Sequence, residues 1–248
     1  MNQHARHWHP VAAYLFVLHL DGPSLAWEYL RRNPNYRLDW QHHRCEDTQA
    51  QCWYLRQYED PGRDARCVQP AWLPEFDASI PLRVDDDPPE VAPAFCLWNI
   101  PGHKSLSDDG RQLRLTSTVG DQVAHMTLAR DLEDGMPYAY AVRAGQQAGA
   151  RWRAIEAQLA MLNTAPEASH PRPSRTALAH MHALQALDGV LSGASQREVA
   201  AAVFGRQAVA ERWYADGDLR AQVRRTIRAG KALMSGGYRR LLQFDMFD

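Results

Sequence analysis

The stretches SQREVAAAVFG (195–205) and DLRAQVRRTIRAGKALMSGG (218–237) decide how the C-terminal part of this chain folds. In the first, Ser195 and Glu198 form a capping-box pattern, in which each side chain can bond the backbone amide of the other residue. The apolar and alanine positions that follow have helical spacing. Gly205 is a natural stop. The first stretch therefore predicts a short, capped helix that other helices can approach closely.

The second stretch predicts a longer helix, from Leu219 to about Met234, with Asp218 as its cap and Gly236-Gly237 after its end. Its expected inner face consists of Leu219, Val223, Ile227, Gly230 and Met234. Beside that face runs a row of cations, Arg220, Arg224, Arg228 and Lys231, with Arg225 to one side. Such a helix fits the major groove of B-DNA, where arginine can bind phosphates or guanine edges.

Charge is distributed unevenly along the chain. Residues 195–240 hold ten basic and four acidic residues, whereas the net charge of all 248 residues is −1. A basic module on an acidic body is the footprint expected of a polyanion binder. The alternatives for a basic amphipathic helix are a solvated face, an anionic membrane or a partner protein. We expect DNA contacts from Arg197, Arg206, Arg220, Arg224, Arg225, Arg228, Lys231, Arg239 and Arg240.

The first helix of this region is typical of a helix-turn-helix, but the connection to the second is long. Residues 206–217 exceed the usual turn of three or four residues. A short helix through Val209–Tyr214 is expected to fill this gap. The predicted motif is therefore a variant of the helix-turn-helix.

The whole chain is predicted to be an α+β protein with a small N-terminal lobe, a central antiparallel β-meander and a helical C-terminal domain. The predicted divisions are a domain at 1–83, an acidic linker at 84–94 and a second domain at 95–248. Within the first, Ser24 is a candidate cap for a helix that ends near Asn33-Pro34, and residues 41–94 are expected to be irregular. The expected core includes Trp27, Leu30 and Tyr14.

Predicted strands occupy four short β-type runs, and helices follow them. The strands are Phe95–Ile100, Leu113–Ser117, Val123–Leu128 and Tyr138–Val142. One helix begins near Gly149, and an amphipathic helix from Leu178 to Leu191 closes near Gly193.

Other classes of protein are less well supported. No apolar run approaches the ~20 residues that span a bilayer, and no secretory signal precedes the domain. The chain has four cysteines, Cys45, Cys52, Cys67 and Cys96, which are too few for a disulfide scaffold, so reduced thiols in the cytoplasm are expected. His42 and His43 lie near three of them, but the Cys-x-x-Cys spacing of structural zinc sites is missing. His103 with Asp108 and Asp109 is a weak hydrolase candidate without a nucleophile motif. We therefore expect no catalytic residues, cofactor or metal.

Three segments resemble a known family. Ser195-Gln-Arg-Glu-Val-Ala200, Leu219-Arg220 through Arg224-Arg225, and Gly236-Gly-Tyr-Arg-Arg-Leu241 resemble the C-terminal DNA-binding domain of RovC-like regulators, which activate type VI secretion genes. Tyr14-Leu-Phe-Val-Leu18 and Trp27–Tyr36 look like the transcriptional regulator-like domain that can precede it.

The resemblance implies a non-enzymatic, sequence-specific activator that binds double-stranded promoter DNA as a homo-oligomer, with a hexamer as the family's notable form. It also implies contact with RNA polymerase. The alternative is an interaction or scaffold protein of a mobile genetic element, and an enzyme is a distant third.

Overall fold

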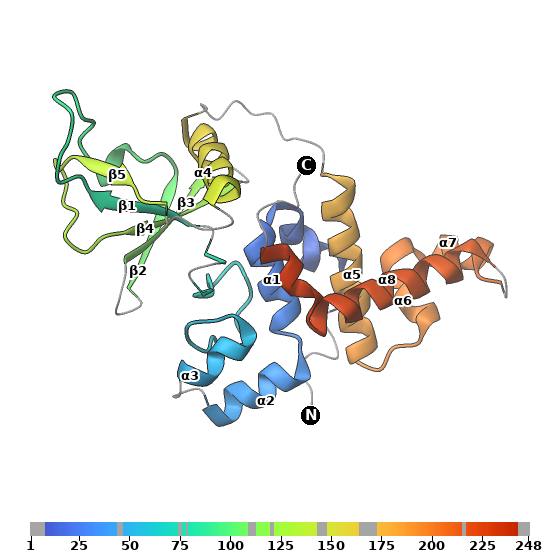
Figure 1. Cartoon of the computed structure of the whole chain (residues 1–248). Helices are drawn as coiled ribbons and strands as arrows, with labels where there is room; N and C mark the ends of the chain where they lie inside the picture. Colours follow the sequence, from blue (N-terminus) through green and yellow to red (C-terminus); the bar gives the residue numbers. More distant parts are fainter. Residues whose placement is uncertain are drawn as a thin grey trace. The chain divides into compact units, whose positions relative to one another are not determined.

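The computed structural model describes residues 8–43, 47–73, 76–77, 79–108, 113–119, 122–142, 148–163, 173–214 and 217–242. Contacts group the chain into two units, of which unit 1 contains residues 1–76 and 172–243 and unit 2 contains residues 77–171 and 244–248. The fold is mixed α+β, as predicted (Figure 1). The predicted domain boundaries around a linker at 84–94 stay a prediction, because these units group residues by contact and join both ends of the chain.

Unit 1 begins with short helices: η2 (Val11–His19), α1 (Gly22–Leu30), α2 (Pro34–His43), α3 (Asp47–Ala50) and η3 (Gln51–Trp53). The N-cap of α1 is Asp21 rather than Ser24, and its Oδ1 accepts a hydrogen bond of 2.9 Å from the Ser24 amide. The early start suits Pro23, whose fixed φ favours the first turn of a helix.

The sequence predicts that a helix ends near Pro34, but in the structure Pro34 begins the further helix α2. The side chain of Asn33 makes this start possible, since its Oδ1 accepts a hydrogen bond of 2.9 Å from the Asn35 amide. Proline at the first helical position loses no hydrogen bond, so Asn-Pro here opens a helix.

The C-terminal elements of unit 1 are α5 (Arg175–Leu191), α6 (Gln196–Phe204), α7 (Arg206–Arg212), α8 (Asp218–Met234) and η5 (Gly237–Leu242). The capping box of Ser195 and Glu198 is present as predicted. The buried residues of α8 are the five of the predicted inner face. The cap of α8 is Gly217 rather than Asp218, which lies in the first turn and bonds the Leu219 amide and Arg212.

One hydrophobic core joins the two halves of unit 1. Helix α5 packs against η2, α6 and α8, and α1 packs against η5 and α8. Trp27, Leu30 and Tyr14 are buried, as predicted. The crossing of α5 and α8 depends on Gly230, where an added Cβ would lie 2.9 Å from the carbonyl oxygen of Ala183. Segments from opposite ends of the chain thus support each other.

Unit 2 contains a five-stranded sheet in the order β2-β3-β4-β1-β5 and helix α4 (Ala148–Asn163), which contacts β4. The strands are β1 (Ile80–Val84), β2 (His103–Asp108), β3 (Leu113–Val119), β4 (Gln122–Leu128) and β5 (Tyr138–Tyr140). Strands β2, β3 and β4 form an antiparallel meander. However, β1 is inserted between β4 and β5, parallel to β4, with Ile80 opposite Met126. The sheet is therefore mixed rather than a simple meander.

Three details of the predicted strands were wrong. The run 95–100 contains η4 (Leu97–Asn99) instead of a strand, and the Leu97 amide donates to Asp134 Oδ1 at 2.8 Å. Strand β1 lies within residues 41–94, which the sequence predicts to be irregular, and it contains Pro81, a residue that is unusual inside a sheet. Strand β2 was also missed, because most of its residues are exposed and it lies at the edge of the sheet.

Candidate nucleic-acid interface

Helix α8 presents the predicted row of cations on its outer surface. Arg224, Arg228 and Lys231 are exposed, and so is Arg225 beside them. The buried face points into unit 1, where Val223 and Ile227 pack. Spacings of four and three residues place successive cations one turn apart along the helix. The helix is thus a rigid support with one apolar face and an adjacent positive one.

The charges of these α8 cations have no ion-paired carboxylate among the described residues. In the part of the chain that the structure describes, Arg224, Arg225, Arg228 and Lys231 take part in no ion pair with a carboxylate. Four like charges along one helix repel each other, and this repulsion lowers the stability of the fold. A carboxylate between them on the same helix would have reduced that cost. Unpaired, exposed guanidinium groups are available to phosphate oxygens without first losing a partner. This is the arrangement expected of a DNA contact surface.

Arg220 differs from the other members of the row. It is half-buried, and its guanidinium carbon lies 5.7 Å from the centre of the Trp213 ring. The segment before α8 is further fixed by the hydrogen-bonded ion pair between Arg212 and Asp218. Arg220 therefore contributes charge to the edge of the face, but packing on Trp213 restricts its orientation.

The remaining predicted DNA contacts lie on other elements of unit 1. Arg239 and Arg240 are exposed on η5, and the Arg239 guanidinium lies 4.7 Å from the centre of the Tyr54 ring. Arg197 on α6 and Arg206 on α7 are also exposed. The nine predicted contacts thus lie on α6, α7, α8 and η5, and their role in DNA binding stays a prediction.

The connection between α6 and α8 contains the short helix that the sequence predicts, at Arg206–Arg212, so it starts three residues and ends two residues earlier than expected. Gly205 alone separates α6 from α7, with a φ of 91° that favours glycine. Both α6 and α7 pack against α8. A usual helix-turn-helix has a turn of three or four residues, so that motif stays a prediction for this chain.

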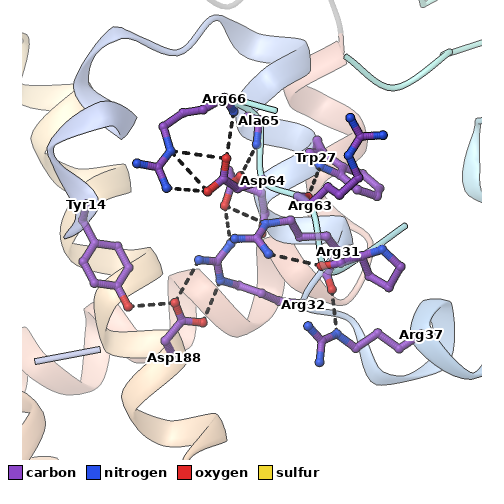
Figure 2. Close-up of polar contacts among 12 residues, drawn as sticks. Tyr14, Trp27, Arg31, Arg32, Arg37, Arg63, Asp64, Ala65, Arg66 and Asp188 are labelled. Carbon is purple, nitrogen blue, oxygen red and sulfur yellow. Dashed lines mark hydrogen bonds and ion pairs between the residues drawn. The ribbon is translucent and has the colours of Figure 1, made fainter. Parts of the chain in front are cut away.

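A buried ionic network holds α1 and α5 together, as Figure 2 shows. The Arg32 guanidinium forms two bonds to Asp188, at 2.7 and 2.8 Å, and a third to Glu28 Oε2 at 2.5 Å. The Tyr14 hydroxyl donates to Asp188 Oδ2 at 2.8 Å. Burial alone would raise the pKa of Asp188, but the charge of Arg32 and these hydrogen bonds hold that pKa below its ordinary value.

Sequence reasoning missed this network. Arg32 and Asp188 are 156 residues apart in the chain, and no sequence motif around either residue indicates the other as its partner. The available signal was the run Arg31-Arg32 directly after an apolar helix, because charged residues so close to a core usually need partners.

No cluster that could hold a metal ion occurs among the described residues. Cys52, Cys67 and Cys96 are free thiols, while Cys45 lies outside the described residues. Asp108 is bound to Arg130 at 2.5 Å, and Asp109 also lies outside the described ranges. Searching the same ranges, we found no helix with the length and hydropathy needed to cross a bilayer.

Comparison with protein families confirms the resemblance and its order along the chain. Residues 7–65 match the proteobacterial transcriptional regulator-like domain, and residues 125–243 match the RovC domain described as a type VI secretion system (T6SS) transcription factor DNA-binding domain. Residues 77–124 match a domain of unknown function. A search of curated proteins gave no match. The matches support a DNA-binding transcription factor, and the α8 row lies within the DNA-binding match.

The limits of these matches do not follow the two contact units. The boundary between the second and third matches, at residues 124 and 125, falls inside β4. The match at residues 7–65 and the C-terminal part of the match at residues 125–243 share the hydrophobic core of unit 1. The regulator-like segment therefore supports, through this shared core, the helices of the segment that matches the DNA-binding domain.

Proposed function

We propose that this chain is a sequence-specific transcriptional regulator that binds promoter DNA through the outer face of α8. One observation carries the proposal: α8 bears a row of exposed cations, Arg224, Arg228 and Lys231, with Arg225 beside it. Among the described residues these side chains form no ion pair, and they lie in a segment that matches a DNA-binding domain. The mechanism is binding and not catalysis.

Affinity and sequence choice come from different groups in this account. Arginine and lysine contacts to phosphates supply affinity that does not depend on sequence. Specificity comes from those α8 side chains that reach base edges in the major groove, where arginine can bind guanine through two hydrogen bonds. Arg239 and Arg240, at the end of the unit, extend the positive surface toward flanking phosphates.

The finer parts of the proposal rest on the family resemblance. The regulator acts in the cytoplasm as an activator of type VI secretion genes, it binds as a homo-oligomer, and the activated promoter brings it into contact with RNA polymerase. A homo-oligomer would multiply individually weak contacts into avidity. Light scattering after size-exclusion chromatography tests this part, and a monomer at the concentration that binds DNA would overturn it.

The DNA-binding proposal is tested by measuring the affinity for promoter fragments over a range of salt concentrations. Each phosphate contact should contribute about 0.9 to the slope of log K against log salt. We expect a steep slope on all duplexes and tighter binding to the operator than to scrambled DNA of equal length. A protein that captures no fragment at low salt would contradict the proposal and favour the interaction or scaffold alternative.

A further inference from the structure

A cavity of about 370 Å³ lies beside the Arg32–Asp188 pair, within unit 1. Its walls come from η2, from the residues at the end of α1 and the start of α2, from residues 64–66 and from the C-terminal end of α5. Its volume is within the range of about 300–1,000 Å³ that small-molecule sites occupy. No part of the DNA-binding proposal uses it.

The polar part of this cavity carries more positive than negative charge. Four arginines line it, namely Arg31, Arg32, Arg37 and Arg66, against two carboxylates, Asp64 and Asp188. Arg31 and Arg32 also share one further carboxylate, that of Glu28, which does not line the cavity. A lining in which guanidinium groups outnumber carboxylates favours an anionic occupant.

Arg31 shares its carboxylate partner, Glu28, with Arg32. Its Nε lies 2.9 Å from Glu28 Oε2 and its Nη1 donates to the Pro61 carbonyl at 3.2 Å, whereas Nη2 has no hydrogen-bond partner among the described residues. Its side chain is only 11% exposed. Burial and the neighbouring charge of Arg32 lower the pKa of Arg31, and burial with both neighbouring guanidinium groups lowers that of Arg37.

The other part of the lining is apolar and aromatic. Trp8, Phe16 and Leu191 contribute to it, and the Arg66 guanidinium lies 4.5 Å from the centre of the Phe16 ring. Arg66 is also held by Asp64, with Nη2 and Oδ2 2.6 Å apart, as Figure 2 shows. This wall is therefore organised before any ligand arrives, which lowers the entropy cost of binding.

We propose that this cavity binds a small organic anion, in which a carboxylate or phosphate group meets the arginines and a compact apolar or aromatic body lies against Trp8 and Phe16. The apolar wall would be unused by free phosphate. The anion would compete with Asp188 and Asp64 for the guanidinium groups. Binding at this cavity requires no DNA, so it stands or falls separately from the proposed function.

The test is isothermal titration of the full-length protein with phenyl phosphate and benzoate as organic anions. Inorganic phosphate and neutral benzyl alcohol are the comparison probes. We expect at least one organic anion to bind more tightly than both comparison probes, because only it uses both walls. If neither organic anion binds, or if inorganic phosphate binds as tightly as phenyl phosphate, the proposal is overturned.

Variants locate the binding. Arg66→Gln should weaken the organic anion about tenfold, the loss expected for one charge-assisted hydrogen bond. The Arg66 side chain is 60% exposed, so the fold should tolerate this change. Arg63→Gln is the matched control, because Arg63 belongs to the same loop and is 53% exposed but does not line the cavity. Leu191→Glu, which adds a negative charge at the lining, should also weaken binding. Unchanged affinity in both Arg66→Gln and Leu191→Glu would place the anion elsewhere and contradict the proposal.

Discussion

Asn33 and Met234 are 201 positions apart in the chain, and the Asn33 Nδ2 donates a hydrogen bond of 2.9 Å to the Met234 carbonyl oxygen. Met234 is the last residue of α8, so this bond satisfies one of the carbonyls that a helix end leaves without a partner. The Oδ1 atom of Asn33 accepts a hydrogen bond from the amide of Asn35 in the first turn of α2. One amide group thus ties an N-terminal helix to the proposed DNA-binding helix.

Replacing this amide by a carboxylate should destabilise unit 1. In Asn33→Asp the oxygen that accepts from the Asn35 amide remains, but the donor to Met234 is lost and a negative charge faces the negative end of α8. We expect the free energy of unfolding to fall by about 1–3 kcal/mol, as for a buried polar group left without its partner. Urea denaturation followed by tryptophan fluorescence measures this loss.

Asn99→Asp is the control for that variant. Asn99 is exposed in unit 2, so the same chemical change there should leave the urea midpoint unchanged. An Asn33→Asp protein as stable as the wild type would show that the bond to Met234 contributes nothing to the fold.

The close crossing of α5 and α8 should be sensitive to a single methyl group. Gly230→Ala places a Cβ 2.9 Å from the Ala183 carbonyl oxygen and 3.4 Å from Leu187 Cβ, so one helix has to move. The overpacking cost of about 1–3 kcal/mol should exceed the gain of about 1 kcal/mol in helix propensity. A lower melting temperature is the expected result.

Gly149→Ala in α4 provides the opposite case. A Cβ at Gly149 meets nothing within 4 Å, so this variant should melt at the same or a higher temperature. If Gly230→Ala were also stabilising, the two helices would have to cross at a greater distance than the structure shows.

The stability of unit 1 should fall as the pH is lowered from 7.5 to 5. Burial lowers the pKa of His180 and of His182, and the Tyr29 hydroxyl lies 3.0 Å from His180 Nδ1. A folded-state pKa below the unfolded value of about 6.5 stabilises the protein above that pH, and the contribution is lost as the pH falls through the folded value. Urea midpoints at several pH values measure this effect.

The double variant His180→Gln, His182→Gln should reduce this pH dependence, while His103→Gln, at an exposed position on β2, should retain it. An identical pH profile in the wild type and the double variant would mean that these two half-buried imidazoles do not cause the effect.

Sequence patterns predicted α8 well because both signals needed for it are local. Its five buried residues recur at helical spacing, and its cations occupy an adjacent face. The same reasoning missed β1, whose strand character comes from its position between β4 and β5 rather than from its own residues. It also missed the pairing of Arg32 with Asp188, since a contact over 156 positions leaves no periodic trace. Local periodicity therefore predicted the candidate interface, whereas the core that supports it required the structure.

The most direct test of the central claim is the affinity of the double variant Arg224→Gln, Arg228→Gln for promoter DNA, measured by fluorescence anisotropy. Both side chains are exposed, so the fold should be retained, which circular dichroism checks. The control Arg83→Gln, Arg175→Gln removes two exposed positive charges from other elements, β1 and the first residue of α5. We predict that the α8 variant loses most of its affinity and that the slope of log K against log salt falls by about 1.8, while the control keeps both. Unchanged DNA binding by a folded α8 variant would contradict the assignment of this helix as the DNA-binding element.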